Sequence, residues 1–311
     1  MADDIKELSG VGPKTAEKLI EAGFDNYMTI AASSAGEIME ATGLGEDTAN
    51  KVILSAREKL NMGFETGTEA MERRTKIGRI TTGSKALDDL IGGGIETQAI
   101  TEAYGAFGSG KSQLAHQLAV NVQMGEDDGG LGGKAIFIDT EQTFRPERIK
   151  QMAMGAGLDP EAALENIFVA RAYNSDHQIV LVEKAEEIAR KEKIKLVIVD
   201  SVTGAFRSEY TGRGTLANRQ QKLNRHLSDL KKLSDVHNLA VFITNQVMSN
   251  PAILFGDPTS PIGGNIIGHG STFRLYLRKS KEDKRIVKLV DAPSLPDGET
   301  IFRVTADGIT D

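Results

Sequence analysis

The stretch AITEAYGAFGSGKSQLAHQLAV, residues 99–120, joins a short apolar run, a glycine-rich loop and an apolar-periodic segment. All eight positions of the loop, GAFGSGKS, fit the phosphate-binding pattern G-x-x-x-x-G-K-S/T. Its glycines let backbone N–H groups turn toward a phosphate, and the helix expected after them points its positive end at the same charge. The stretch predicts a strand–loop–helix unit that binds a nucleoside triphosphate through Gly105, Ala106, Phe107, Gly108, Ser109, Gly110, Lys111 and Ser112.

Phosphoryl transfer needs a cation on the phosphates, a held Mg²⁺ ion and a group that orients or activates the attacking water. Lys111 is expected to reach the β- and γ-phosphates, and the Ser112 hydroxyl to ligate Mg²⁺. Asp200 ends the apolar run LVIVD and is the second expected metal residue, unless it only caps the next turn. Glu141 is the candidate general base. Gln246 is placed to sense the γ-phosphate, with a buried structural glutamine as the alternative.

From residue 78 onward, apolar runs alternate with helical patterns such as HQIVLVEKAEEIARKEK. This alternation predicts an α/β fold with a mostly parallel sheet, whose ligands lie at the carboxyl ends of the strands. The stretches TFRLYLRKS and KRIVKLVDAP read instead as antiparallel strands, so we expect a mixed central sheet. The three clearest buried parallel strands are residues 135–139, 195–200 and 239–246.

Residues 1–60 are expected to form a small all-α domain. GVGPKTAEKLIEAG, starting at Gly10, is echoed by GLGEDTANKVILSA, starting at Gly43, and both continue with the apolar spacing of a helix. The glycines allow a tight turn with exposed N–H groups, which resembles the helix-hairpin-helix family of DNA-backbone binders. A helical bundle whose glycines only make turns is the alternative. The second copy carries Glu46 and Asp47 and is expected to be mainly structural.

Residues 61–77 are the expected linker to a large domain that spans residues 78–311. Phe64 stands alone there among polar and small residues. It either packs on its own domain or inserts into a neighbouring subunit, because aromatic anchors dominate interface energies. Adjacent extended residues could then add to the neighbour's sheet edge.

Composition excludes several classes of protein. The 311 residues are 40% hydrophobic and 26% charged, the balance of a globular protein, and no apolar run approaches the roughly 20 residues of a membrane span. There is no cysteine, which excludes disulfides and thiolate metal sites, and the first residues do not resemble a secretory signal. We therefore expect a cytoplasmic protein. Residues 1–70 hold 13 acidic and 6 basic side chains, so the net charge of −7 leaves the remainder neutral.

A nucleic-acid interface would need a local basic patch, because the overall charge mildly repels a polyanion. The segment 207–225 contains five basic side chains and a single acid, Glu209, and the overlapping stretch LANRQQKLNRHLSDL, residues 216–230, is expected to be helical. Such a patch would bind DNA phosphates with an affinity that falls steeply as salt rises, whereas a solvated helix face is the alternative. The DNA-binding candidates are Arg207, Arg213, Arg219, Lys222 and Arg225.

Motifs along nearly the whole chain resemble, in order, those of the RecA/RadA family of DNA strand-exchange recombinases. They are GAFGSGKS, IDTEQTFRPER, VARAYNSDHQ, LVIVDS, RSEYTGRGTLANRQQKLNRHL, ITNQV, IGGNIIGHGSTFRLYLRK and DAPSLPDGETIFRVTADGI. The resemblance implies a RecA-type P-loop ATPase core behind a helix-hairpin-helix domain. It implies a DNA-dependent ATPase that forms a helical filament on single-stranded DNA and catalyses homologous pairing in recombination and double-strand break repair.

The same resemblance implies cofactors and nucleotide contacts. ATP and Mg²⁺ would be bound, and acidic cap residues would admit a monovalent cation such as K⁺. Arg148 would lie against the adenine ring. The segment DAPSLPD, residues 291–297, would cap the nucleotide of a neighbouring subunit, chiefly through Asp291 and Pro293.

The implied partners are single- and double-stranded DNA, further copies of the chain in a filament or ring, and accessory recombination proteins, in the cytoplasm at the nucleoid. A second DNA loop would span residues 248–265 and include Gly263 and Gly264. The residues implied at the subunit interface are Phe64, Gly67 and His269.

Three residues depart from the family pattern: Gln142 stands in place of a glycine, Gly67 in place of an alanine and Asn265 in place of a histidine. Two rival functions share the same core. One is a hexameric helicase, against which the N-terminal hairpins and the linker around Phe64 argue. The other is a regulatory relative that binds DNA and ATP without exchanging strands, but such relatives usually lack the N-terminal domain.

Overall fold

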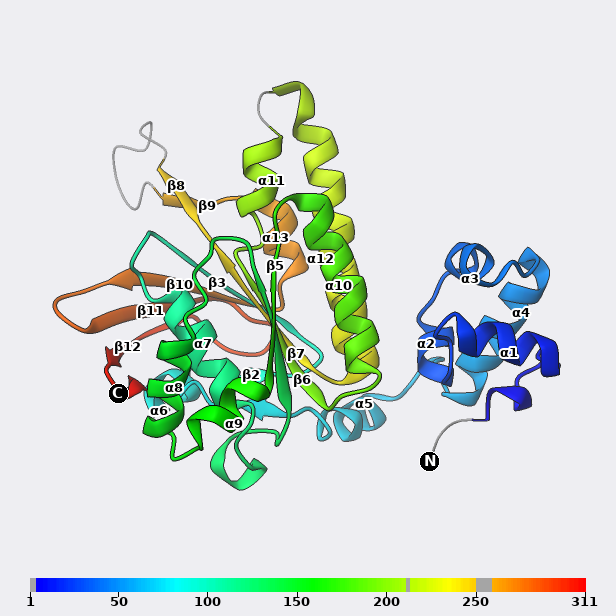
Figure 1. Ribbon diagram of the computed structural model, residues 1–311, viewed down its shortest axis with the longest axis horizontal. Helices are drawn as coiled ribbons and strands as arrows, with labels where there is room; N and C mark the ends of the chain where they lie inside the picture. Colours follow the sequence, from blue (N-terminus) through cyan, green and yellow to red (C-terminus); the bar gives the residue numbers. More distant parts are fainter. Residues whose placement is uncertain (1–3, 211–212, 250–258) are drawn as a thin grey trace. The chain divides into compact units, whose positions relative to one another are not determined.

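Figure 1 shows the computed structural model of the chain, which describes residues 4–210, 213–249 and 259–311. The chain divides into two compact units, Met1–Lys76 and Ile77–Asp311, each of which is described by itself. Within the described ranges, no helix is both long and apolar enough to pass through a bilayer.

The first unit packs short helices around its own apolar core. Gly10 and Gly43, which open the two copies of the repeat, take φ values of +92° and +68°, where a side chain would be strained. Gly12 and Gly45 are the N-caps of the helices that follow, so both copies turn as the repeat predicts. The elements are η1 (Ile5–Glu7), α1 (Pro13–Glu21), α2 (Tyr27–Ala31), α3 (Ala35–Thr42), α4 (Glu46–Lys59) and α5 (Gly67–Arg74).

Helix α5 lies in the segment for which the sequence predicts only a linker. It starts with a capping box: the Thr66 hydroxyl accepts from the Glu69 N–H at 3.3 Å, and the Glu69 carboxylate accepts from the Thr66 N–H at 2.7 Å. None of its residues is buried. Local capping rather than core packing therefore defines this helix. Gly67, expected in the docking motif, is its first residue.

The second unit is built on a nine-stranded sheet with the order β13-β12-β11-β10-β3-β7-β6-β4-β5. Pairing is parallel from β10 to β5 and antiparallel from β13 to β10, which confirms the mixed, mostly parallel sheet. Its strands are β3 (Ile100–Gly105), β4 (Lys134–Asp139), β5 (Ile167–Arg171), β6 (Ile194–Asp200), β7 (Ala240–Asn245), β10 (Phe273–Lys279), β11 (Lys284–Asp291), β12 (Gly298–Thr305) and β13 (Gly308–Thr310).

Helices cover both faces of this sheet (Figure 1). Successive residues of β4 alternate between two apolar cores: Ala135 and Phe137 face one core, and Ile136 and Ile138 face the other. The first core is covered by α6 (Lys85–Leu90), α7 (Lys111–Asn121), α8 (Pro146–Gly155) and α9 (Pro160–Glu165). The second is covered by α10 (Ser175–Ala189), α11 (Gly204–Glu209), α12 (Leu216–His237) and α13 (Gly264–Gly270).

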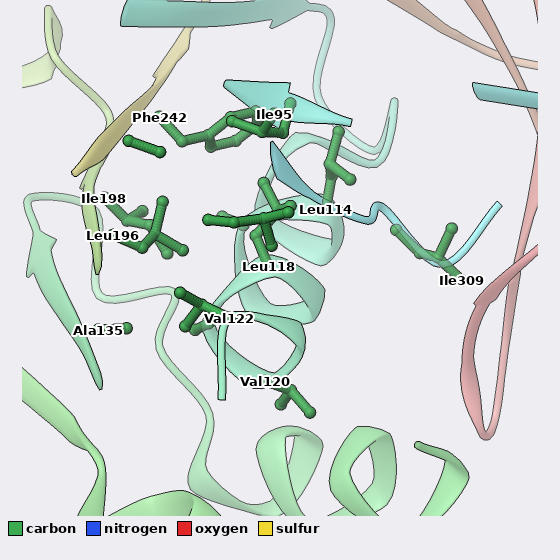
Figure 2. Packing of buried hydrophobic residues seen from close by; sticks show 14 of the residues in the cluster. Ile95, Leu114, Leu118, Val120, Val122, Ala135, Leu196, Ile198, Phe242 and Ile309 are labelled. Carbon is green, nitrogen blue, oxygen red and sulfur yellow. The ribbon is translucent and has the colours of Figure 1, made fainter. Parts of the chain in front are cut away.

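The helix that follows the glycine loop is deeply packed in the first core. Eight of the eleven residues of α7 are buried, and Figure 2 shows Leu114 and Leu118 on the side of α7 that faces Leu196, Ile198 and Phe242 of the sheet. The glycine loop is therefore anchored on a rigid helix.

Two small two-stranded sheets and two single 3₁₀ turns complete the described part of the unit. β8 pairs antiparallel with β9 and leads out from the end of β7, while residues 250–258 of the expected second DNA loop lie outside the described residues. These elements are β1 (Arg79–Ile80), β2 (Ile95–Glu96), η2 (Glu126–Asp128), η3 (Arg213–Thr215), β8 (Val247–Ser249) and β9 (Thr259–Pro261).

Candidate nucleotide-binding site

Four neighbouring strands bring the expected nucleotide residues to one edge of the sheet. Because β3, β7, β6 and β4 are adjacent and parallel, their carboxyl ends lie side by side. β3 runs into the glycine loop and β7 is followed at once by Gln246. β6 ends at Asp200, and Glu141 comes two residues after the end of β4. Residues from four distant parts of the sequence are thus gathered around the loop.

The glycine loop requires glycine for steric reasons. A Cβ atom at Gly105 would lie 2.2 Å from the carbonyl oxygen of Leu277 in β10. Gly108 and Gly110 have φ values of +77° and +103°, a region that favours glycine. Gly110 is also the N-cap of α7, so the unpaired N–H groups of the first helical turn face the loop. Phe107 is fully exposed on the outside of the loop.

Lys111 folds back over the loop that precedes it. Its Nζ donates to the carbonyl oxygens of Gly105 at 2.9 Å and Ala106 at 3.0 Å. Burial lowers the pKa of Lys111, while the nearby carboxylates of Asp200 and Glu141 act in the opposite direction. The amine is therefore held in a partly desolvated place, where an additional anion would interact with it strongly.

The loop and its surroundings fit a polyphosphate with Mg²⁺. The hydroxyl oxygen of Ser109 is buried and has no hydrogen-bond partner in the structure, although buried polar atoms are normally paired. Among the described residues, no cluster of three acidic or histidine side chains could hold a metal ion alone. A Mg²⁺ ion would instead use Ser112, Asp200 through water, and oxygens of the nucleotide, as Mg²⁺ commonly does in such sites.

Asp200 is buried and fixed by two hydroxyl donors. Its side chain is 1% exposed, and Oδ2 accepts from the Thr143 hydroxyl at 2.9 Å. Oδ1 accepts from the hydroxyl of Thr244 in β7. The register places Asp200 beside Asp139 at the end of β4. Hydrogen bonds to both oxygens fix the orientation of this buried carboxylate.

Glu141 is held through one of its two carboxylate oxygens. Oε1 accepts from the Ser201 hydroxyl at 2.8 Å and from Nε2 of Gln246 at 2.6 Å. Gln246 thus connects the end of β7 to the candidate base. Ser201 was not singled out from the sequence, because a serine after a strand carries no distinctive pattern.

Asp139 fixes the loop that carries Glu141. Its carboxylate accepts from the backbone N–H groups of Glu141 at 3.0 Å, Thr143 at 3.1 Å and Phe144 at 3.0 Å. Between these donors, Gln142 takes φ +59°, the left-handed region that favours glycine. The geometry explains in physical terms why a glycine suits this position. Asp139 was also missed from the sequence, where it is only the last letter of a strand.

His116 ties the same loop to α7. Its Nδ1 lies 2.6 Å from the Ser112 carbonyl oxygen, and its Nε2 accepts from the Arg145 N–H at 3.3 Å. A carbonyl can only accept, so Nδ1 carries the hydrogen and the ring is neutral. Burial lowers the pKa of His116, in keeping with that state. The ring stacks on Phe137 and lies tilted against Phe144. This histidine carries no motif and was not predicted.

Arg148, expected to lie against adenine, is anchored beside α7. Its guanidinium donates to Gln113 Oε1 at 2.8 Å, to the Thr305 carbonyl at 2.7 Å and to the Ala306 carbonyl at 2.6 Å. The planar group is therefore fixed between α7 and the turn after β12, and burial lowers its pKa.

The cap residues lie at the opposite end of β10 from the glycine loop of their own chain. β10 pairs with β3 through Leu277 opposite Gly105, at the loop, and with β11 through Arg274 opposite Asp291. These two positions on β10 are about 10 Å apart along the strand. Asp291 and the exposed Pro293 are therefore not brought to the loop of their own chain.

The first basic segment follows β6 and rises from the same edge of the sheet (Figure 1). Arg207 in α11 and Arg225 in α12 are exposed, and Arg219 is half-buried. Arg213 begins η3, but its side chain and residues 211–212 lie outside the described part of the chain.

Of the candidates whose side chains are described, Lys222 is the one in an ion pair. Its Nζ lies 2.7 Å from the Asp176 carboxylate and 5.5 Å from the centre of the Tyr210 ring. Hydrogen bonds to both residues raise the pKa of Lys222. DNA would have to compete with Asp176 for this amine.

The described end of the expected second DNA loop turns at two glycines. Gly263 and Gly264 have φ values of +88° and +55°, and a Cβ atom at Gly263 would lie 2.6 Å from Ile267. His269 is exposed near the end of α13. In the first unit, Phe64 is fully exposed, three residues before α5.

Comparison with known proteins agrees with this architecture. The Rad51 family model matches residues 73–311, and the model of the SAM-like helix-hairpin-helix tandem matches residues 2–58. A DNA repair and recombination protein RadA of Halobacterium salinarum is 52% identical over 98% of this chain and 98% of its own length. The protein of the same name from Haloquadratum walsbyi is 51% identical over 99% of this chain and 98% of its own. The chain therefore belongs to the RadA/Rad51 family of DNA repair and recombination proteins.

Proposed function

We propose that the chain is an ATP-dependent recombinase that exchanges DNA strands from a filament on single-stranded DNA. The observation that carries the proposal is the shared edge of the sheet. β6 carries Asp200 and continues into the first basic segment, and β7 leads to Gln246 and then to the second DNA segment. The same strand ends can therefore respond to nucleotide and to DNA. The names of the two haloarchaeal relatives support the assignment to recombination and repair.

The site suits hydrolysis of ATP to ADP and phosphate. When bound, Mg²⁺ would neutralise charge on the phosphate oxygens. Lys111 would leave the loop carbonyls and place its charge on the β- and γ-phosphates. Glu141 has both of its described hydrogen bonds on Oε1, so Oε2 can orient the attacking water and accept its proton. Asp139 and Ser201 keep that carboxylate in position.

The two segments at the sheet edge would bind DNA chiefly through its phosphates. Arg207 and Arg225 offer exposed guanidinium groups on α11 and α12, and phosphate contacts carry no sequence information. Base edges would remain free to pair with a second duplex, which strand exchange requires. The turn before α1, with Gly10 at φ +92° and the N–H groups at the start of that helix, is a second place for a DNA phosphate.

The nucleotide site would be completed by another copy of the chain. Asp291 and Pro293 lie at the far end of β10 from the glycine loop, so they can cap only the nucleotide of a neighbour. The exposed Phe64 would anchor that neighbour. β5 is a free edge of the sheet, and its Val169 is 46% exposed. We propose that Phe64 packs there and that adjacent residues add to this edge, as peptides do on other open sheets.

We further propose three functional regions: residues 1–60 as the hairpin domain, 61–77 as the docking linker and 78–311 as the ATPase core. A K⁺ ion at Asp291 belongs to the same proposal, because a carboxylate that faces a neighbour's γ-phosphate would otherwise repel it.

Substitution of the loop lysine tests the assignment. Lys111→Ala should lower ATP turnover by about a hundredfold or more, because it removes a preorganised cation from the transferring phosphoryl group. Lys150→Ala is the matched control, since Lys150 lies in α8 and forms a surface ion pair with Glu161. Normal hydrolysis and strand exchange by the Lys111 variant would refute the proposed site.

A further inference from the structure

Asn245, the last residue of β7, is fully buried and joins three parts of the core unit. Its Oδ1 accepts from the Thr203 hydroxyl at 2.7 Å. Its Nδ2 donates to Glu102 Oε1 at 2.8 Å and to the Ile262 carbonyl oxygen at 2.7 Å. Since both ends of the amide are used, its orientation is fixed, and neither an aspartate nor a serine could reproduce the set.

Glu102 extends this arrangement across the sheet to β10. Its side chain is 0% exposed, and its Oε2 accepts from Nε of Arg274 at 2.8 Å. The Arg274 guanidinium lies 5.3 Å from the centre of the Tyr104 ring. It also packs under α13, since a Cβ atom at Gly268 would lie 3.1 Å from one of its nitrogens. A buried ion pair thus lies beneath the helix that carries His269.

The members of this group lie at the roots of both DNA segments. Thr203 is the N-cap of α11, with which the first segment starts. Ile262 follows β9 and precedes Gly263, at the end of the second segment. Asn245 directly precedes Gln246, which donates to Glu141. We call Glu102, Arg274, Asn245 and Thr203 the root cluster.

A purely stabilising role explains the root cluster poorly. Removing two charges from water is costly, and apolar residues of similar shape are often as good for stability as a buried ion pair. What a hydrogen-bonded polar group does provide is one defined arrangement of the elements that it joins, although Nη2 of Arg274 is buried without a hydrogen-bond partner among the described residues. Here those elements are the strand before the glycine loop, the strand before Gln246, and the roots of both DNA segments.

We propose that the root cluster is a positioning device that transmits DNA binding at the two segments to Gln246 and Glu141, and so lets DNA stimulate ATP hydrolysis. The proposal rests on the proposed function. Thr203 and Ile262 are the points at which movement of a segment reaches Asn245. Because Asn245 and Gln246 are consecutive, a shift of the first changes the donor that holds the candidate base.

The test uses the full-length chain and a poly-dT oligonucleotide as the DNA. The double variant Glu102→Gln/Arg274→Met removes both charges and the ion pair that fixes residue 102 against Asn245, so Asn245 is no longer held from β10. The matched control is Arg79→Met/Glu96→Gln, an ion pair of the same 2.8 Å length that lies between β1 and β2, before the start of β3. ATP turnover with and without DNA, ATP affinity and the melting temperature are measured for each.

We expect the cluster variant to keep its fold, its ATP affinity and its DNA-independent turnover, and to lose about tenfold in stimulation by DNA, within the usual range of coupling between two sites. The control should be stimulated as the unaltered chain is. Thr203→Val removes only one hydroxyl and should also reduce stimulation. If the double variant does not fold, Thr203→Val is the variant that tests the proposal.

Stimulation that persists in the double variant, or in Thr203→Val where only that variant folds, would overturn the inference. So would equal loss in the control pair, because it would mean that any ion pair of the unit has this effect. If DNA does not stimulate the unaltered chain, the proposed function fails first, and the inference fails with it.

Discussion

The carboxylate of Glu141 is held on one side and open on the other. Ser201 and Gln246 both donate to Oε1, and a glutamine amide has a second N–H to offer. Gln246 could therefore contact a γ-phosphate while it still holds Glu141. The Gln246 side chain would then contact both the γ-phosphate and the candidate base.

Gln142 provides a prediction about backbone strain next to that base. A non-glycine residue in the left-handed region is strained by roughly 1–2 kcal/mol, and part of that is offset because glycine is more flexible in the unfolded chain. Gln142→Gly should raise the free energy of unfolding by up to about 1 kcal/mol, measured by urea denaturation. Gln142→Ala, which retains a Cβ atom, should give no gain. A glycine variant less stable than the parent would contradict the φ of +59°.

The side chains with chemical roles at this edge could be found from sequence, but those that hold them could not. Lys111 belongs to an eight-position pattern, and Asp200 ends an apolar run. Asp139 accepts from backbone N–H groups of the loop that follows it, and His116 contacts the Ser112 carbonyl and the Arg145 N–H, so both act through the folded path of the backbone. No spacing in the chain encodes such contacts.

In the first basic segment, Arg207 of α11 and Arg225 of α12 have exposed guanidinium groups, whereas the Lys222 amine is held in an ion pair. Each phosphate contact on single-stranded DNA contributes about 0.7 to the salt slope of the binding constant. Arg225→Ala should therefore lower that slope by about 0.7, measured by fluorescence anisotropy at several salt concentrations. Lys85→Ala, in a surface ion pair with Asp89, is the control. An unchanged slope for the Arg225 variant would remove that residue from the interface.

The three clearest predicted strands, β4, β6 and β7, are buried on both faces and read as continuous apolar runs. β5 was not singled out as a strand, since its residues alternate between partly covered and exposed positions at the sheet edge. α5 was missed for another reason: its signal is the capping box at Thr66 and Glu69, in a segment with no apolar face. Strands at the sheet edge and helices in the linker are thus the elements that apolar sequence patterns predict least well.

At the scale of the whole molecule, the account requires more than one copy of the chain. The cap residue Asp291 pairs with one end of β10, whereas the glycine loop lies toward its other end. Phe64 is fully exposed. Phe64→Ala should shorten the oligomers that analytical ultracentrifugation detects with ATP. The reason is that an aromatic anchor often contributes about 2 kcal/mol or more to the binding free energy of an interface. Met62→Ala, a nearby exposed apolar change, should leave them as they are. Oligomers of unchanged length would contradict the role of Phe64 as an intersubunit anchor.

The most direct test of the central claim is electron microscopy of the protein with single-stranded DNA and a non-hydrolysable ATP analogue, beside a sample without nucleotide. Long helical filaments that form only with the nucleotide are the expected result. Closed rings threaded on the strand, with no filaments, would contradict it and indicate a helicase-like motor.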